Sequence, residues 1–275
     1  MRRIITLLLI VVCLLLSSLG VAGAENKKGP IVIQGALKIE TLYLIDQLTG
    51  VKEVNYGPYT FYEGTLDGYP VVVSRTLPGD ANAAVATYIA IEKYNPAVII
   101  NQGLLGGYAT NMNVYDIVVA SNVINVGSVK TPVRAAGQGS NALEWEALPL
   151  TESAFSSGKG DALSFESDKS WVERAMSEAT NYKRGKVAKG VIVSSDMWNN
   201  EYDRIQSFRK KYNALAEDME SAAAAEVCKN FKVPFLSIGL ISSNVINNTT
   251  YQRGSGVACQ AFVLSVVQSY IKDNK

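Results

Sequence analysis

Residues 214–228 read Ala-Leu-Ala-Glu-Asp-Met-Glu-Ser-Ala-Ala-Ala-Ala-Glu-Val-Cys. Three acidic residues, Glu217, Asp218 and Glu220, surround Met219, and a run of alanines, which are strong helix formers, follows them. Acidic residues at a helix start are stabilised by the helix dipole, so the stretch predicts an acidic N-terminus on a buried, alanine-rich helix. A second interpretation stays open at this point: one carboxylate points into a site and accepts hydrogen bonds from a polyol.

Composition and charge exclude several classes of function. The chain has 275 residues, of which 48% are hydrophobic and 19% charged, and this suits a globular domain with a sizeable core. A net charge of +1 gives no electrostatic case for binding nucleic acid or an anionic membrane surface. The chain contains no histidine, which excludes Ser-His and Cys-His catalysis and almost all zinc sites. We therefore expect neither a metal nor a cofactor, and any acid–base chemistry must use Asp, Glu, Tyr, Lys or water.

The N-terminus has the pattern of a secretory signal. Arg2 and Arg3 precede an apolar run over 4–16, and a small-residue cleavage site, Ala-Gly-Ala, follows. The pattern predicts a signal peptide at residues 1–24, one domain over 25–275, and a secreted or periplasmic location. Contact with a membrane is then expected only through the signal segment before cleavage. An uncleaved N-terminal anchor is the alternative.

Apolar periodicity predicts alternating strands and helices. Predicted strands cover 30–36, 59–66, 69–76, 97–101, 117–120, 187–193 and 234–240. Predicted helices cover 38–48, 82–94, 170–182, 199–212, the alanine-rich stretch and 256–272. The alternation indicates an α/β fold, and a hairpin around Asp67-Gly68 adds an antiparallel part to its sheet. Residues 127–169 have loop character and read as a long excursion.

Polar and glycine-rich segments follow four of the predicted strands. They cover residues 35–40, 103–107, 194–198 and 242–244. Ligands of open α/β sheets bind at the carboxyl ends of the strands, so these segments are expected to meet there. The acidic helix start is a fifth candidate for the same place.

The order of these segments resembles that of 5′-methylthioadenosine/S-adenosylhomocysteine nucleosidases, in the superfamily of nucleoside phosphorylases and nucleosidases. Gly-Ala-Leu-Lys-Ile-Glu at 35–40 resembles the family's Gly-Ala-Met-x-x-Glu, and the glycine pattern at 98–107 is similar to its second motif. Val-Tyr-Asp-Ile-Val-Val at 114–119 resembles Val-Gly-Asp-Ile-Val-Val, and 218–222 resembles Met-Glu-(small)-Ala. The match continues through 227–235 and covers nearly all of 30–270.

The resemblance implies a three-layer α/β/α sandwich around a central mixed sheet, assembled as a homodimer. It implies cleavage of the N-glycosidic bond of a purine nucleoside. By position in the motifs, Glu40 activates the attacking water and Glu220 holds the ribose hydroxyls. A carboxylate suits both roles, because it takes a proton from water and accepts hydrogen bonds at both of its oxygens.

The resemblance also implies the remaining substrate-binding residues. The backbone of Met219 lines the sugar, and Trp198 takes the place of an aromatic residue near the base. Leu104 and Gly106 belong to the second glycine motif, where Leu104 stands at a position that the family usually fills with a smaller residue.

One family residue is missing. An Asp in the family's Arg-x-Ile-Ser-Asp motif protonates the leaving purine, whereas residues 239–244 read Gly-Leu-Ile-Ser-Ser-Asn. A gapless alignment places Ser243 at the acid position, and one inserted residue places Asn244 there. Neither is a carboxylic acid, and an amide donates a hydrogen bond but no proton at neutral pH. Asp196 and Asp218 are other candidates for a proton donor.

We therefore expect an exported purine nucleoside N-ribohydrolase in which Glu40 activates water. A phosphate-dependent phosphorylase is the first alternative, but the first glycine loop offers only Lys38 for an anion, with Arg75 and Arg134 unplaced. A second is a protein that binds a nucleoside or nucleobase without turnover, and a third is a storage or structural role without a ligand. Two further interpretations are open for Trp145, as a loop anchor or a ligand contact, while Asp116 is predicted to accept from backbone donors.

Overall fold

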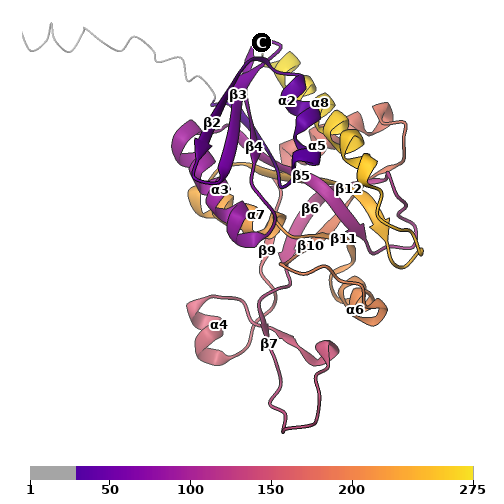
Figure 1. Cartoon of the computed structure of the whole chain (residues 1–275). Helices are drawn as coiled ribbons and strands as arrows, with labels where there is room; N and C mark the ends of the chain where they lie inside the picture. Colours follow the sequence, from indigo (N-terminus) through magenta and orange to yellow (C-terminus); the bar gives the residue numbers. More distant parts are fainter. Residues whose placement is uncertain (1–28, 275) are drawn as a thin grey trace, which may run out of the picture.

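Ten strands form one mixed sheet in residues 29–274, the part of the chain that this computed structural model describes (Figure 1). The predicted signal peptide lies outside these residues. The main path runs β11-β10-β6-β12-β5-β1-β4-β3-β2, and β9 pairs with β6. The strands are β1 (Ile31–Gly35), β2 (Thr49–Tyr56), β3 (Tyr59–Leu66), β4 (Tyr69–Arg75), β5 (Val98–Gly107), β6 (Ile117–Asn125), β9 (Ser164–Glu166), β10 (Val187–Ser194), β11 (Ala214–Asp218) and β12 (Phe235–Asn244).

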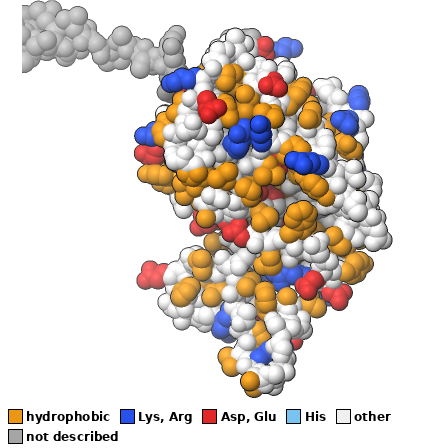
Figure 2. Space-filling view, in the orientation of Figure 1, with side chains coloured by type: hydrophobic (Ala, Val, Ile, Leu, Met, Phe, Trp, Pro, Cys, Tyr) orange, Lys and Arg blue, Asp and Glu red, His pale blue; other side chains and the backbone are white. Residues whose placement is uncertain are grey.

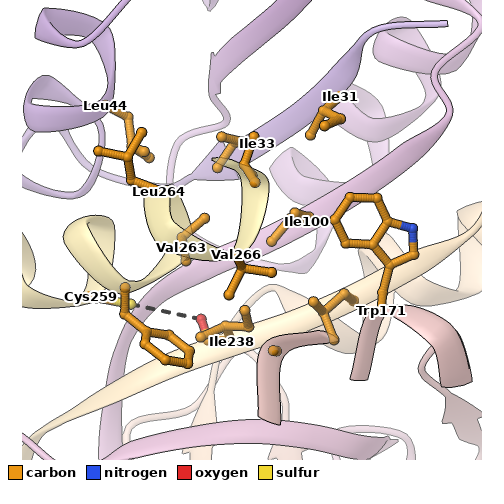
Figure 3. Close-up of a cluster of buried hydrophobic side chains, with 14 of the residues drawn as sticks. Ile31, Ile33, Leu44, Ile100, Trp171, Ile238, Cys259, Val263, Leu264 and Val266 are labelled. Atoms are coloured by element: carbon orange, nitrogen blue, oxygen red, sulfur yellow. Dashed lines mark hydrogen bonds between the residues drawn. The ribbon is translucent and has the colours of Figure 1, made fainter. Parts of the chain in front are cut away.

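Strands β4, β1, β5 and β12 are parallel to one another, β12 pairs antiparallel with β6, and the side chains of β1 alternate between two apolar layers. Ile31 and Ile33 of β1 point to one face and Val32 to the other, and all three are fully buried. The first face is covered by α2 (Leu42–Asp46), α5 (Lys169–Ser177) and α8 (Gly256–Asp273), and Figure 3 shows Ile33 and Ile100 packed beside Val263 and Val266 of α8. The second face is covered by α3 (Asp80–Tyr94) and α7 (Ser221–Phe231). The predicted three-layer α/β/α fold around a mixed sheet is confirmed.

Helix α8 is strongly apolar because it is buried. By length and hydropathy it would suit a membrane span, but 61% of its most apolar window is buried inside the protein. Its apolar side chains pack on β5 and β12, so this is a core helix.

Several predicted boundaries were wrong, and packing explains why. The glycine-rich segment after residue 101 is not a loop, since β5 continues to Gly107 between β12 and β11. The acidic residues Glu217 and Asp218 do not open a helix but end strand β11, and α7 begins only at Ser221. Strand β2 was missed because it is an exposed edge with few apolar residues.

The predicted excursion is a projecting segment. Residues 126–163 leave the sheet after β6 and contain the short pair β7 (Val129–Lys130) and β8 (Glu146–Ala147) and the helix α4 (Glu152–Ser157), which extend from the main body in Figure 1. Acidic and basic side chains are interspersed among hydrophobic ones on the face shown in Figure 2. Helix α6 (Tyr202–Tyr212) packs beside β11.

Two buried polar side chains hold loops to the sheet. Asp116 accepts hydrogen bonds from the backbone N–H groups of Asn113 (2.8 Å) and Lys186 (2.9 Å), so its predicted structural role is confirmed. Gln260 of α8 accepts from the N–H groups of Tyr43 (2.9 Å) and Leu44 (3.3 Å). It also donates to the carbonyls of Ile39 (2.8 Å) and Gly256 (3.0 Å). The single amide thus ties the chain on both sides of Glu40 to the last helix.

We expect Gln260→Leu to lower the free energy of unfolding by about 2 kcal/mol or more, because it leaves buried N–H and C=O groups without partners. Denaturant unfolding of the purified variant measures this loss. Gln268→Leu is the matched control, since Gln268 lies on the exposed side of the same helix. Equal stabilities for the two variants would contradict the assigned role of Gln260.

Candidate active site

A cavity of about 330 Å³ opens at the carboxyl ends of β1, β5, β10, β11 and β12. All the segments that the sequence placed at strand ends meet here, as expected for an α/β sheet. The lining residues are Ala36, Leu37, Glu40, Pro78, Leu104, Leu105, Gly106, Met197, Trp198, Glu217, Asp218, Met219, Glu220, Ser242, Ser243 and Tyr251. Of the predicted catalytic and substrate-binding residues, the cavity contains Glu40, Ser243, Leu104, Gly106, Trp198, Met219 and Glu220 but not Asn244.

Glu40 lies at one end of the cavity on a short 3₁₀ turn, Lys38–Glu40, that follows β1. Its carboxylate accepts from the N–H of Leu37 (2.8 Å) and from the N–H of Leu104 on β5 (3.0 Å). The contact with β5 requires a glycine, because a Cβ at Gly103 would lie 2.9 Å from Oε1 of Glu40. Burial raises the pKa of Glu40, and the backbone donors oppose that shift. The result is a fixed carboxylate with increased basicity.

Glu220 and Asp218 stand beside Glu40. Glu220 is the N-cap residue of α7, and its carboxylate accepts from the N–H groups of Gly79 (3.0 Å) and Met219 (3.1 Å). Burial and then the charge of Asp218 raise the pKa of Glu220 to about 8. Asp218 accepts from the hydroxyl (2.8 Å) and the N–H (3.2 Å) of Ser221, which caps the first turn of α7. Asp218 thus caps the first turn of α7, and its neighbours Met219 and Glu220 line the cavity.

Glu217 lies at the other end of the cavity. Its carboxylate accepts from the Tyr108 hydroxyl (2.5 Å), from Nδ2 of Asn199 (2.5 Å) and from the N–H of Asn199 (3.0 Å). Burial raises the pKa of Glu217, and the hydrogen bonds from Tyr108 and Asn199 oppose the shift. The site therefore holds four carboxyl groups, and two of them, Glu40 and Glu217, contact strand β5 at Gly103 and Gly106.

Ser243 and Asn244 lie in different surroundings. Ser243 lines the cavity, where it pairs with Gly106 in the β5–β12 ladder. Asn244 is fully buried outside the cavity: its amide donates to the carbonyls of Ala109 (3.0 Å) and Met112 (2.8 Å) and accepts from the N–H groups of the turn that follows. The prediction that Asn244 contacts the leaving base is corrected, because its amide nitrogen holds the segment after β5 and its amide oxygen holds the turn after β12.

The mouth and wall of the cavity are apolar and aromatic. Trp198 is 62% exposed, and its ring meets that of Tyr251 edge-to-face at 6.2 Å. Leu105 fills the space over Gly239, where a Cβ would lie 2.4 Å from the leucine side chain. Gly239 therefore leaves room for the side chain of Leu105.

Lysine and arginine are absent from the residues that line the cavity. Of the candidates for an anion site, Lys38 is exposed, and Arg75 lies over the ring of Tyr62 and donates to Thr41 (3.4 Å). Arg134 pairs with Glu144 in the projecting segment. The residues that line the cavity thus include acidic groups and no basic side chain that could hold an anion.

The sequence analysis missed some of these residues and left others open. Asp218 and Glu217 were quoted in the opening stretch, but the strand that aims Glu217 was not foreseen. Nothing in the sequence pattern singled out Asn199 or Tyr251. Asp196, a candidate proton donor, is exposed and accepts from the N–H of Asp80 (2.7 Å) outside the cavity. Trp145 stacks on Arg204 (5.1 Å) away from the cavity, which favours the loop-anchor interpretation.

Comparison with known proteins connects this geometry to one family. Residues 30–267 match the model of the Phosphorylase superfamily. A 5′-methylthioadenosine/S-adenosylhomocysteine nucleosidase of Anoxybacillus flavithermus is 32% identical over 213 residues, which cover 77% of this chain and 84% of that protein. The corresponding nucleosidase of a Geobacillus species is 29% identical over 248 residues, covering 88% and 99%.

Solved structures agree with the sequence matches. The nucleosidase of Neisseria meningitidis, in complex with methylthio-immucillin-A, superposes with a TM-score of 0.73 at 25% identity and covers 87% of this chain and 99% of that one. The enzyme of Colwellia psychrerythraea, in complex with adenine, has a TM-score of 0.72 at 25% identity and covers 88% and 96%.

Asn244→Ala is expected to lower the free energy of unfolding by about 2 kcal/mol or more, since it removes four hydrogen bonds of a fully buried amide, to Ala109, Met112, Ile246 and Asn247. Denaturant unfolding tests this, with Ser243→Ala on the cavity wall as the control. A larger loss for Ser243→Ala than for Asn244→Ala would contradict the structural role of the asparagine.

The thermal stability of the protein is expected to fall as pH rises. The pKa of Glu220 is raised from 4.5 to about 8, and burial with the charge of Asp196 raises that of Asp80 from 3.8 to about 7. The folded state thus retains protons that the unfolded chain loses, so stability decreases as pH rises from about 4 to about 8. We expect a lower Tm at about pH 8 than at about pH 5, and a smaller difference in Glu220→Gln. An unchanged difference in that variant would contradict the assignment.

Proposed function

Because this chain belongs to the Phosphorylase superfamily, we propose that it is a purine nucleoside N-ribohydrolase with the reaction type of the 5′-methylthioadenosine/S-adenosylhomocysteine nucleosidases. The observation that carries the proposal is the composition of the cavity wall. It combines fixed carboxylates at Glu40 and Glu220 with an aromatic mouth at Trp198. This is the set of groups that a sugar with a leaving base requires.

Cleavage of an N-glycosidic bond builds positive charge on the sugar in an oxocarbenium-like transition state. The charge of Asp218 raises the pKa of both Glu220 and Glu40, and the charge of Glu40 also raises the pKa of Glu220, so the three carboxyl groups lie close together. Fixed negative charge in a water-poor site stabilises the developing cation more than the neutral substrate, which lowers the barrier. The same carboxylates repel an anion, so the site is better suited to the transition state than to a nucleotide.

Glu40 is the group that activates the attacking water in this proposal. Its Oε1 and Oε2 are held by the N–H groups of Leu104 and Leu37, so the carboxylate does not need to reorganise when it takes the proton. Its raised pKa makes it a stronger base than a solvated glutamate. Glu220, held by Gly79 and Met219, keeps lone pairs for two vicinal hydroxyls of the ribose.

Water is favoured over phosphate as the nucleophile. A phosphorylase must hold a phosphate anion with arginines or lysines, and none of the residues that line the cavity is basic. Four carboxyl groups around the same space would raise the free energy of a bound phosphate further. The phosphorylase alternative is therefore less well supported.

A binding protein without turnover is the second candidate. The observation in its favour is Ser243, which stands on the cavity wall where the family places the acid and carries a hydroxyl instead of a carboxyl group. Such a protein would release no base from a bound nucleoside.

We also propose that residues 1–24 direct export to a secreted or periplasmic location, that residues 25–275 form one domain, and that the protein is a homodimer. The apolar run at 4–16 supports export, and the family resemblance supports the dimer. N-terminal sequencing of the exported protein and light scattering in solution test these points.

Incubation with inosine, adenosine, methylthioadenosine and S-adenosylhomocysteine, with and without phosphate, is expected to release free base and free sugar at rates that do not depend on phosphate. Glu40→Gln is expected to lower the rate by about 100-fold or more, because the amide takes no proton from water. Chromatography of base and sugar measures both.

Glu166→Gln is the matched control, because Glu166 is exposed on β9 and lies outside the cavity. Release of base only in the presence of phosphate would replace the hydrolase by a phosphorylase. A stable complex with intact nucleoside and no release after long incubation would establish the binding protein.

A further inference from the structure

Glu217 places a carboxyl group at the position where the family's acid is missing. In the sheet, Gly106 pairs with Ser243 of β12 on one side and with Glu217 of β11 on the other. The Glu217 side chain lies over Gly106, since a Cβ there would be 3.1 Å from both its Cγ and its Oε1. Glu217 and Ser243 thus flank the same cavity-lining glycine, and a carboxyl group on β11 stands opposite the hydroxyl on β12.

This end of the cavity is separate from the end that holds Glu40. The two carboxylates contact Gly103 and Gly106, three residues apart on one strand, which corresponds to about 10 Å along β5. Asp218 and Glu220 lie near Glu40, whereas Trp198 precedes Asn199, which binds Glu217. A nucleoside with its sugar between Glu40 and Glu220 therefore extends its base toward Trp198 and Glu217.

A chain of buried hydrogen bonds fixes the Glu217 carboxyl group. Nε of Arg204 donates to Oδ1 of Asn199 (2.8 Å), which orients the amide so that its Nδ2 donates to Glu217 (2.5 Å). Tyr108, which is 1% exposed and stacks on Phe208, supplies the second donor to the same carboxylate oxygen. Oε1, the oxygen over Gly106, accepts from the N–H of Asn199, and Glu217 is one of the residues that line the cavity.

We propose that Glu217 contacts the leaving purine and protonates it, in place of the acid that Ser243 lacks; this inference rests on the proposed hydrolase function. The proton passes from Glu217 to a ring nitrogen of the base, and the electron pair of the breaking C–N bond moves into the ring. The water oxygen bonds to the anomeric carbon, and its proton passes to Glu40. Solvent then removes the proton from Glu40 and returns one to Glu217.

The surroundings of Glu217 suit both of its protonation states. Burial raises its pKa, so the carboxyl group retains a proton at higher pH than a solvated glutamate. After proton transfer, the carboxylate is stabilised by donors from Tyr108 and Asn199 that are already in place. Preorganised donors of this kind favour the state with the negative charge that develops in the transition state.

The other candidate donors are less well placed. A serine hydroxyl at Ser243 is a far weaker acid than a carboxyl group, and Asn244 is outside the cavity. Asp218 accepts the hydrogen bonds of Ser221 at the start of α7, and Asp196 is exposed. Burial raises the pKa of the Tyr251 phenol above its already high value, which makes it a poorer donor near neutral pH.

Two substrates with different leaving groups can show whether Glu217 acts as an acid or only supports the structure. A purine needs a proton to leave, whereas 4-nitrophenolate leaves a riboside without one. With the purified full chain, Glu217→Gln is expected to lower the hydrolysis of purine nucleosides by about 100-fold or more and to leave 4-nitrophenyl β-D-ribofuranoside hydrolysis near the wild-type rate. Glu40→Gln should lose both activities, and Glu166→Gln should keep both.

A second variant tests the acid through the pH profile. Tyr108→Phe keeps the carboxyl group but removes a donor that lowers the pKa of Glu217, so the pKa rises. The rate of purine release, which requires protonated Glu217, is then expected to persist to higher pH than in the wild type. A structural role for Tyr108 would lower the rate at all pH values without this shift.

The outcomes distinguish the two proposals. Wild-type purine hydrolysis by Glu217→Gln, or an equal loss of both substrates, would overturn the role of Glu217 and leave the hydrolase intact. Failure of the unaltered protein to release base from any nucleoside would overturn the hydrolase itself, and the acid with it.

Discussion

The contact of two carboxylates with the bare backbone of strand β5 sets the geometry of the whole cavity. Glu40 approaches Gly103 and Glu217 approaches Gly106 so closely that a Cβ at either position would lie about 3 Å from the carboxylate side chain, at 2.9 and 3.1 Å. Strand β5 pairs with β12 along one side and, on the other, with β1 at residues 98–101 and with β11 at Gly106 and Gly107. The glycines therefore serve a regular strand and not a flexible loop, and the spacing of the carboxylates is the spacing of the strand.

Desolvation of acidic groups is the main cost of this arrangement. Burial is the largest influence on the pKa of Glu40, Glu217, Asp218 and Glu220, and in each case it disfavours the ionised form. The protein opposes this with backbone N–H groups and with hydroxyl and amide donors, and not with lysine or arginine, in the residues that line the cavity. Neutral donors hold the carboxylates in place without cancelling the negative field, which is the property that a cationic transition state uses.

The distant parts of the chain support the same geometry. Gln260 in the last helix holds the segments on both sides of Glu40, and Arg204 in α6 orients the asparagine that binds Glu217. Arg204 also contacts the rings of Trp145 and Phe208, so its side chain connects the projecting segment 126–163 to the part of the cavity that holds Glu217. Each end of the site is thereby fixed by an element remote in sequence.

The order of apolar strands, glycine motifs and helices in the sequence was enough to establish the α/β fold and to bring Glu40, Gly106, Trp198 and Glu220 to one set of strand ends, because periodicity and strand polarity are local properties of the chain. The absence of histidine and of a family acid could likewise be read directly. The sequence could not show which of Ser243 and Asn244 faces the cavity. A one-residue shift in a strand moves a side chain from the cavity face to the interior, and a bulge in the β5–β12 ladder sets that register. The role of Glu217 could not be predicted either. In the sequence it is one of several acidic residues before a helix, and only the pairing of β11 with both β10 and β5 directs its side chain to the cavity. Pairing between strands far apart in sequence depends on the packing of the complete sheet, so the tertiary structure alone assigns these two walls of the site.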